Sequence, residues 1–168
     1  MKTVDPRTKI VTLERLLALR AEWRQQGRTV VWTNGCFDVV HIGHIRNLLA
    51  AARQGDLLVV GINSDASVRR IKGPNRPVIP HDERAELLAA LACVDFVVVF
   101  EDDTVIPLLS RLRPEIHCKG AEYAPPHGKP VPEADTVRAH GGEIRYMPQI
   151  PNHSTSEIIR RIGEVIGH

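Results

Sequence analysis

Short runs of apolar and β-branched residues alternate along this chain with longer stretches in which apolar residues recur at helical spacing. Two of the short runs, LLVVGI and FVVVF, are apolar on both faces, as strands covered by helices on both sides require. Runs of this kind occupy residues 29–33, 57–62, 96–100, 115–118 and 143–147. The alternation predicts five parallel strands joined by helical crossovers.

The stretches with helical period fall at about 12–26, 43–54, 64–72, 82–92, 104–112, 132–140 and 154–167. Three of them have recognisable starts: Thr104 as an N-cap, Pro132 as a first helical residue, and Ser154 with Glu157 as a capping box. Segments 73–80 and 123–132 are too rich in proline for helix or central strand, and we expect them to wrap over an edge or mouth. The predicted fold class is α/β, a Rossmann-like open parallel sheet of five strands with helices on both faces.

The length and composition narrow the classes of protein that this chain can be. Its 168 residues fit one domain, 1–168, with a core at about 27–162. A net charge of +2, a pI of 8.6 and 4% aromatic residues argue against a nucleic-acid binder. The three cysteines form no Cys-x-x-Cys pair, which excludes a zinc ribbon and suits a reducing cytoplasm. No segment suggests a membrane anchor, so we expect a cytoplasmic protein.

Candidate chemistry is concentrated where the first predicted strand meets the next helix. The strand ends in TNGCFD, and VVHIGH opens the helix, at the end of the sheet where α/β proteins bind anionic ligands. Gly35 lets the turn tighten, and Gly43 allows a phosphate to approach the backbone. His41 and His44 are three residues apart, so both rings lie on one face of the helix. Metal ligation by this pair with Asp38, or two plain polar residues at an exposed helix start, are the alternatives.

The segment TNGCFDVVHIGH resembles the signature of the cytidylyltransferase-like nucleotidyltransferases, whose His-x-Gly-His motif is present as residues 41–44. The likeness continues downstream and is similar in order to the heptose 1-phosphate adenylyltransferase branch. It is carried by Asn63-Ser64-Asp65, Lys72-Gly73, Arg76-Pro77-Val78, Arg84, Val94-Asp95, Lys119-Gly120 and Ser154-Thr155-Ser156. Class I aminoacyl-tRNA synthetases share the letters HIGH, but this chain lacks their Lys-Met-Ser-Lys-Ser loop.

The resemblance implies that a sugar 1-phosphate attacks the α-phosphate of a nucleoside triphosphate in line and releases pyrophosphate. Four residues are the expected catalytic groups: His41 and His44 as donors to the reacting phosphate, and Lys72 and Arg84 as cations that bracket the phosphates. Asp38 and Arg76 are expected to bind the substrate. The nucleotide and its phosphates are expected to contact Thr33, Asn34, Gly35, Phe37, Gly43, Lys119, Gly120, Ser154, Thr155 and Ser156.

The expected partners are ATP and a sugar 1-phosphate, with D-glycero-D-manno-heptose 1-phosphate as the sugar and ADP-heptose as the product. Mg²⁺ is the expected cofactor, held mainly by the triphosphate, and no metal ligand is assigned to the protein. A separate sugar kinase or phosphatase is expected upstream, and a homodimer is possible by analogy with the family. No binding to nucleic acid or membrane is expected.

Some positions depart from the heptose branch and leave the substrates open. Ala121-Glu122 stands where Gly-Asp is frequent, and Asn152-His153 precedes the serine motif where Gly-Cys is common. A cytidylyltransferase acting on glycerol 3-phosphate or another polyol phosphate is therefore the first alternative. A non-catalytic nucleotide-binding regulatory module is the second, and a metal-dependent hydrolase is the last.

Overall fold

The computed structural model describes residues 5–148 and 154–167. Its five strands form one sheet in the order β3-β2-β1-β4-β5, and every neighbouring pair is parallel. The strands are β1 (Val30–Gly35), β2 (Leu57–Asn63), β3 (Phe96–Phe100), β4 (Ile116–Gly120) and β5 (Glu143–Met147). The prediction of an open parallel sheet of five strands is confirmed.

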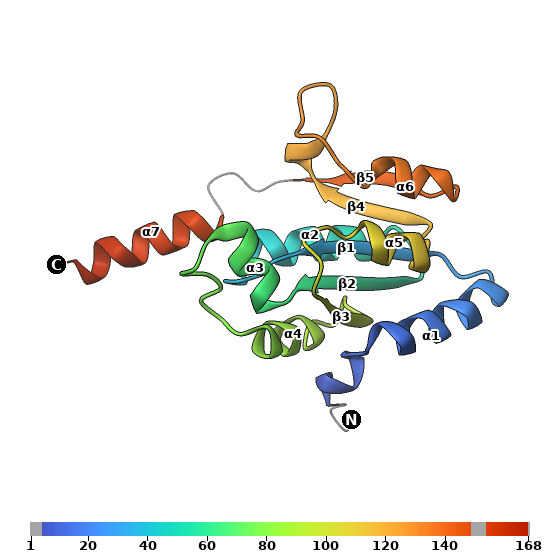
Figure 1. Cartoon of the computed structure of the whole chain (residues 1–168), viewed down its shortest axis with the longest axis horizontal. Coiled ribbons are helices and arrows are strands. Elements are labelled where there is room, and N and C mark those ends of the chain that lie inside the picture. The colour runs from blue at the N-terminus through green and yellow to red at the C-terminus, as the bar shows by residue number, and fades with distance from the viewer. Residues whose placement is uncertain (1–4, 149–153, 168) are drawn as a thin grey trace.

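In the described ranges, seven α-helices and two short 3-10 helices connect and flank the strands (Figure 1). The 3-10 helices are η1 (Pro6–Lys9) and η2 (Ala121–Tyr123). The α-helices are α1 (Leu13–Gln25), α2 (Ile42–Ala52), α3 (Asp65–Lys72), α4 (His81–Ala89), α5 (Ile106–Leu112), α6 (Ala134–Ala139) and α7 (Thr155–Ile166). None of these described helices is both long and apolar enough to cross a membrane.

Helices cover both faces of the sheet because successive strand residues point to opposite sides. Val31 belongs to a core cluster with Leu48 of α2 and Leu88 of α4. Its neighbour Trp32 belongs to the other cluster, together with residues of α1, α5 and α6. Leu16 in α1 is fully buried, so the packed body begins before the expected boundary at residue 27.

Helix α7 lies apart from this packed body. It extends away from the sheet in Figure 1, and none of its residues is buried. Ser154 caps it as predicted, because its hydroxyl oxygen accepts a hydrogen bond from the Glu157 N–H at 3.2 Å. Glu157 does not complete the capping box in the described contacts, since its carboxylate pairs with Arg160 instead.

Two other predicted helix starts are wrong. Val105, not Thr104, is the N-cap of α5, and its side chain makes no capping bond. Pro132 lies two residues before α6, whose N-cap is Glu133. Thr104 failed as a start because Pro107, which needs no hydrogen-bonded N–H, occupies the first turn and shifts the helix onward. The N-cap of α6, Glu133, makes no capping bond with its side chain, because its carboxylate contacts His117 and Lys119 outside the helix.

The two proline-rich segments behave differently from each other. Segment 73–80 joins α3 to α4 and packs over the turn that follows β1, as expected, because Val78 and Ile79 donate backbone hydrogen bonds to Asp38. Segment 123–132, which precedes α6, projects from the body beyond β5 (Figure 1). It projects from this edge of the sheet instead of wrapping over it as its proline content suggested.

Candidate active site

A cavity of about 230 Å³ lies between the carboxyl ends of β1 and β4. The sheet order makes this the point where successive connections leave in opposite directions, which is where open α/β sheets bind ligands. Its walls are Thr33, Asn34, Gly35, Phe37, His44, Asn47, Leu48, Cys118, Lys119, Gly120, Glu122 and Tyr123. A larger hollow of about 780 Å³ near Arg24 and Arg113 holds none of the motif residues, so we place the candidate site in the smaller cavity.

The end of β1 is shaped by bonds that fix its polar side chains. Thr33 donates its hydroxyl to the Cys118 carbonyl at 3.1 Å, which ties β1 to β4. The indole N–H of Trp32 donates to the Asn34 side-chain oxygen at 3.2 Å, so the amide nitrogen of Asn34 remains a donor for the cavity. Phe37 adopts a left-handed φ of 47°, a strained conformation that is frequent at ligand-binding turns. A Cβ on Gly35 would lie 3.2 Å from the Phe37 ring.

His41 and His44 stack at the start of α2. Their ring centroids are 3.9 Å apart with an interplanar angle of 29°, which confirms that both rings share one face. His41 is the N-cap of the helix, and its Nδ1 accepts the Gly43 N–H at 3.1 Å. A neutral His41 ring therefore carries its proton on Nε2, where it can be donated to a ligand.

His44 is held in its neutral form by its surroundings. Burial lowers its pKa to about 4, and the charge of His41 acts in the same direction. Phe37 packs against the His44 ring with centroids 5.1 Å apart. At neutral pH this imidazole is therefore a hydrogen-bond donor without a net charge, fixed against an aromatic ring.

The N-terminus of α7 reaches the same loop. The Thr155 hydroxyl lies 3.5 Å from the Val39 carbonyl, two residues before His41. The hydroxyl and N–H groups of this helix start thus lie beside the histidine turn, and a phosphate contact by Ser154, Thr155 and Ser156 stays a prediction. Asn152 and His153, where the sequence departs from the heptose branch, lie outside the described residues.

Lys119 lies at the end of β4 and lines the cavity together with His44. Its ammonium donates to Glu133 at 2.9 Å and sits 4.5 Å from the centroid of the Tyr123 ring. Gly120 follows, and a Cβ there would clash with the Glu122 carboxylate. The structure thus brings Lys119, Gly120 and His44 to one cavity.

The model of the cytidylyltransferase-like family matches residues 32–161, which include the β1 turn, the histidine pair and the start of α7. The chain belongs to the cytidylyltransferase-like family. This match agrees with the resemblance of the segment TNGCFDVVHIGH and covers most of the sheet.

Among relatives in the cytidylyltransferase-like family, the bifunctional protein HldE of Syntrophotalea carbinolica is 51% identical over 139 residues, which are 83% of this chain and 28% of that protein. The HldE of Trichlorobacter lovleyi is 48% identical over 160 residues, which are 95% of this chain and 32% of that protein. The chain thus spans about a third of the length of these relatives.

Two solved structures share the fold. The lipopolysaccharide core biosynthesis protein from Thermoplasma volcanium has a TM-score of 0.58 and 24% identity, covering 74% of this chain and 98% of that one. Pantoate-beta-alanine ligase from Francisella tularensis has a TM-score of 0.55 and 15% identity, covering 95% of this chain and 79% of that one. At these identities the likeness shows the nucleotidyltransferase-like fold of the family.

Asp38 and Arg76, the residues expected to bind the substrate, bind each other in this family member. Arg76 Nε donates to one Asp38 oxygen at 2.5 Å, and the other oxygen accepts the backbone N–H groups of Val78 and Ile79 at 2.7 and 2.9 Å. Asp38 is only 1% exposed. Both carboxylate oxygens therefore anchor segment 73–80 over the turn after β1, and a substrate contact through Asp38 would require these bonds to open.

Arg84 is completely buried, which differs from the expectation that its guanidinium brackets the phosphates. Its three nitrogens donate to the carbonyls of Ile79 and Cys36 at 2.9 and 2.5 Å and to the Asp65 carboxylate at 2.7 Å. Burial acts to raise the pKa of Asp65, but hydrogen bonding to Arg84 contributes to a net lowering. The buried guanidinium of Arg84 thus stabilises the turn after β1, and it is not exposed to a ligand.

Lys72, the last residue of α3, belongs to the same side of the turn. Burial raises the pKa of the Cys36 thiol, whereas the positive charges of Lys72, Arg84 and Arg76 act to lower it. The three cations are therefore grouped around the turn after β1, and Lys119 stands across it in the cavity. A phosphate contact by Lys72 remains a prediction.

Asn47 lines the cavity and Glu133 supports it, although the sequence analysis singled out neither residue. Asn47 lies three residues after His44 on α2, so the spacing of the histidine pair, extended by one turn, would have found it. Glu133 has no comparable local signal, because it reaches Lys119 from the far end of a loop.

Proposed function

We propose that this chain is a nucleotidyltransferase that joins ATP and D-glycero-D-manno-heptose 1-phosphate to give ADP-heptose and pyrophosphate. The observation that carries the reaction class is the stacked pair His41 and His44, which opens a helix at the switch point of the sheet beside Lys119. The adenylyl and heptose assignments are supported by the downstream motifs and by up to 51% identity to proteins named HldE.

The proposed reaction requires the two anionic substrates, the sugar phosphate and the triphosphate, to be aligned, and it does not require a base to remove a proton from the nucleophile. A phosphate monoester has a second pKa near 6, so the attacking oxygen is already ionised at neutral pH. That oxygen forms a bond to the α-phosphorus while the bond from this phosphorus to the bridging oxygen breaks, and the electron pair leaves with pyrophosphate. His41 and His44 donate hydrogen bonds to oxygens on which charge develops, as in an oxyanion hole.

Magnesium enters this proposal with the triphosphate. No group of three or more His, Cys, Asp or Glu residues capable of holding a metal occurs in the described ranges, and both oxygens of Asp38 are engaged. The residues of 5–148 and 154–167 therefore present no such group for a metal. The MgATP complex, in which the phosphates supply most of the ligands, is the form of substrate that suits such a site.

The reaction is tested by measuring pyrophosphate release over a matrix of ATP and CTP against heptose 1-phosphate and glycerol 3-phosphate. We expect turnover with ATP and heptose 1-phosphate and at least tenfold less with the other pairs. Turnover with CTP and glycerol 3-phosphate alone would establish the cytidylyltransferase alternative. Binding of ATP without turnover of any pair would establish the regulatory module and contradict the proposal.

The acceptor in this reaction is already phosphorylated, so an earlier step must produce it. We place that step in a separate sugar kinase or phosphatase and place the whole sequence in the cytoplasm. The support is chemical: ATP is a cytoplasmic substrate, and the three cysteines are free thiols that a reducing compartment maintains.

We further propose a homodimer in which α7 packs against α7 of a second copy. The helix presents an apolar stripe that no described part of the same chain covers, with Ile162, Val165 and Ile166 exposed by 49%, 78% and 76%. Full burial of an aliphatic side chain is worth about 1.5 to 3 kcal/mol. A twofold pairing would cover both stripes at once.

Sedimentation measurements test this arrangement. The wild-type chain is expected to sediment as a dimer at micromolar concentration, and the double variant Ile162→Asp with Val165→Asp as a monomer, because it places two charges in the stripe. Glu164→Gln, a charge change on the same helix, is the control and should leave the dimer intact. A monomeric wild type at tens of micromolar would refute the pairing.

A further inference from the structure

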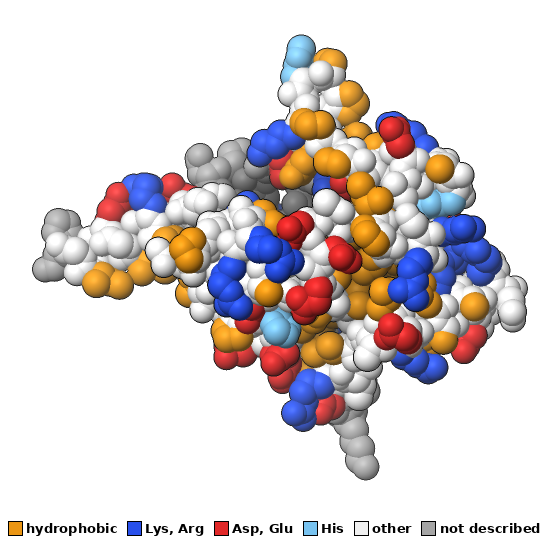
Figure 2. Space-filling view, in the orientation of Figure 1, with side chains coloured by type: hydrophobic (Ala, Val, Ile, Leu, Met, Phe, Trp, Pro, Cys, Tyr) orange, Lys and Arg blue, Asp and Glu red, His pale blue; other side chains and the backbone are white. Residues whose placement is uncertain are grey.

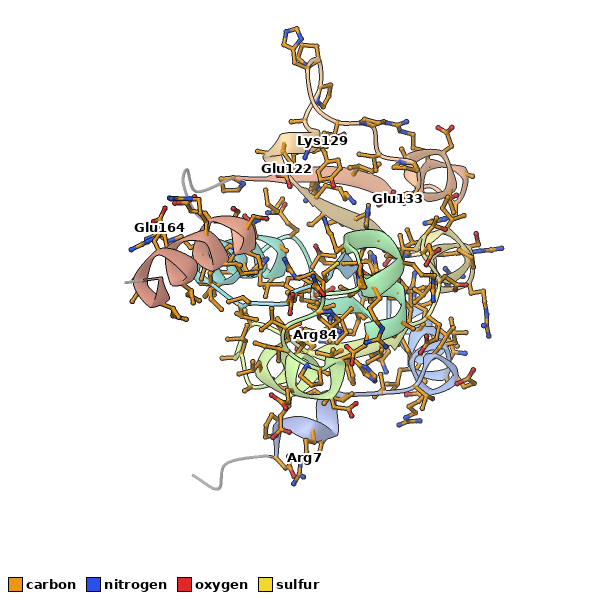
Figure 3. The ribbon with its side chains drawn as sticks, turned by 60° about the vertical axis from the view of Figure 1, so that its left-hand side comes forward. Arg7, Arg84, Glu122, Lys129, Glu133 and Glu164 are labelled. Carbon is orange, nitrogen blue, oxygen red and sulfur yellow. The ribbon has the colours of Figure 1, made fainter. Side chains whose placement is uncertain are left out.

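A buried carboxylate links two residues of β4 beneath the candidate site. Glu133, at the start of α6, is only 5% exposed. A single oxygen of its side chain lies 3.0 Å from His117 Nε2 and 2.9 Å from Lys119 Nζ. Figure 3 shows Glu133 near the far end of the loop that carries the labelled Lys129 and that follows η2 with Glu122. His117 and Lys119 are two residues apart on one strand, so both point to the side on which Glu133 stands.

The charges of this group are fixed by their mutual contacts. Burial acts to raise the pKa of Glu133, but hydrogen bonds from His117 and Lys119 outweigh it and hold the pKa at about 2. Burial lowers the pKa of His117, whose side chain is completely enclosed, so this ring is neutral and donates from Nε2. The carboxylate and the ammonium therefore form one ion pair, with a neutral histidine behind it.

Glu133 and Tyr123 together restrict where the Lys119 ammonium can go. The ammonium contacts the carboxylate on one side and the ring of Tyr123 on another. A lysine side chain carries about 2 kcal/mol of rotamer entropy, so an unanchored lysine must lose that freedom when it binds a ligand. An ammonium has three donors, and the pair with Glu133 uses one of them. The others are available at the wall of the cavity that Lys119 shares with His44.

We propose that Glu133 is a positioning residue that holds Lys119 at the cavity wall, ready to donate to a phosphate of the anionic substrate. The inference rests on the proposed function and assigns a role to a residue that no motif contains. His117 takes part by donating to the same carboxylate oxygen, which keeps that oxygen in place. The alternative is a purely structural network that stabilises the loop before α6 without affecting the ligand.

A double-mutant cycle separates these two roles. The variants are Glu133→Ala, Lys119→Ala and the double variant, and KM and kcat are measured for each substrate along with the melting temperature. We expect Glu133→Ala to raise KM for one substrate about tenfold with a smaller change in kcat, and to add no further increase in the Lys119→Ala background. Glu133→Gln keeps an acceptor at the same place and should recover most of the loss. It also serves if Glu133→Ala does not fold.

Asp135→Ala is the matched control, because it removes a fully exposed carboxylate from the same helix. It should change neither KM nor the melting temperature. If Glu133→Ala and Lys119→Ala have fully additive effects, or if Glu133→Ala lowers only the melting temperature, the positioning role is wrong.

Equilibrium binding of MgATP and of heptose 1-phosphate, measured by calorimetry in the same four proteins, keeps this test independent of turnover. Absence of wild-type turnover with retained, non-additive binding would remove the proposed reaction and keep the Glu133 role. Wild-type turnover with additive effects of the two substitutions on binding would support the proposed reaction and contradict the Glu133 role. If Lys119→Ala weakens the binding of neither ligand, the inference is overturned.

Discussion

Replacement of His41 or His44 by alanine is expected to lower kcat for pyrophosphate release by about 10² to 10³, which corresponds to roughly 3 to 4 kcal/mol of lost transition-state stabilisation. The reason is that each ring supplies a fixed donor to oxygens whose charge grows during the reaction, and alanine supplies none. Because the rings stack on each other, removing one also frees the other to turn. The double variant should therefore cost less than the sum of the two single losses.

The control for these variants is His127→Ala, which removes an exposed histidine from the projecting segment 123–132. It should leave kcat unchanged. Wild-type rates in both His41→Ala and His44→Ala, with normal melting temperatures, would contradict the donor mechanism. A loss confined to KM would instead show that the pair binds ground state and transition state equally.

The pKa of His44 gives the same mechanism a pH signature. Its value of about 4 in the folded chain lies below the ordinary 6.5, so the unfolded chain binds the proton more readily between these values. Stability from this group is therefore present above pH 6.5 and is lost as the pH falls toward 4. Within pH 6.5 to 8 the protonation of His44 does not change, and it contributes no slope to the rate there.

The five strands of the sheet could be predicted from the sequence because each is a short apolar or β-branched run that is recognisable on its own. LLVVGI and FVVVF are buried, β-branched runs that match β2 and β3 nearly end to end. Helix starts were less secure, since Thr104 offered a good cap in isolation but Pro107 moved the helix onward. The exposed position of α7 was also not predictable, because an amphipathic pattern does not reveal whether the element that covers the apolar face is in the same chain.

The same division applies to the site. His41 and His44 were recognisable because their relation is local, and the stacking follows from a spacing of three on one helix. The partners of the cations were not, because each pair joins residues far apart in the chain. Asp38 meets Arg76 across 38 positions, and Asp65 meets Arg84 across 19. No pattern within a window of the sequence reports such contacts.

These long-range pairs change the picture of the site's electrostatics. Arg76, Arg84 and Lys119 each have a carboxylate partner, so the described residues do not form an open basic cradle. A phosphate that bonds Arg76 or Arg84 must therefore displace the carboxylate partner, whereas the Lys119 ammonium has further donors beside its pair with Glu133. In the proposed reaction the two histidines, Lys119 and the start of α7 are the groups that orient the phosphates.

Arg84→Ala is expected to lower the free energy of unfolding by about 3 kcal/mol, because it removes a buried guanidinium, leaves two carbonyls without their donor and takes the partner from Asp65. Urea denaturation measures this change. Arg84→Lys keeps the charge but supplies no planar fork, and should recover less than half of the loss. Triphosphate binding should weaken only as far as the turn after β1 loosens.

The control is Arg69→Ala, which removes an exposed arginine from α3 and should change the unfolding free energy by less than about 0.5 kcal/mol. If Arg84→Ala unfolds at the wild-type urea concentration while its affinity for MgATP falls a hundredfold, Arg84 contacts the phosphates directly and must leave its buried partners to do so. If both the stability and the MgATP affinity of Arg84→Ala fall, a further measurement decides between the two roles. Recovery of the MgATP affinity at a saturating concentration of the sugar phosphate would show that Arg84 acts by ordering the turn after β1, because the bound sugar phosphate then orders that turn in place of the guanidinium.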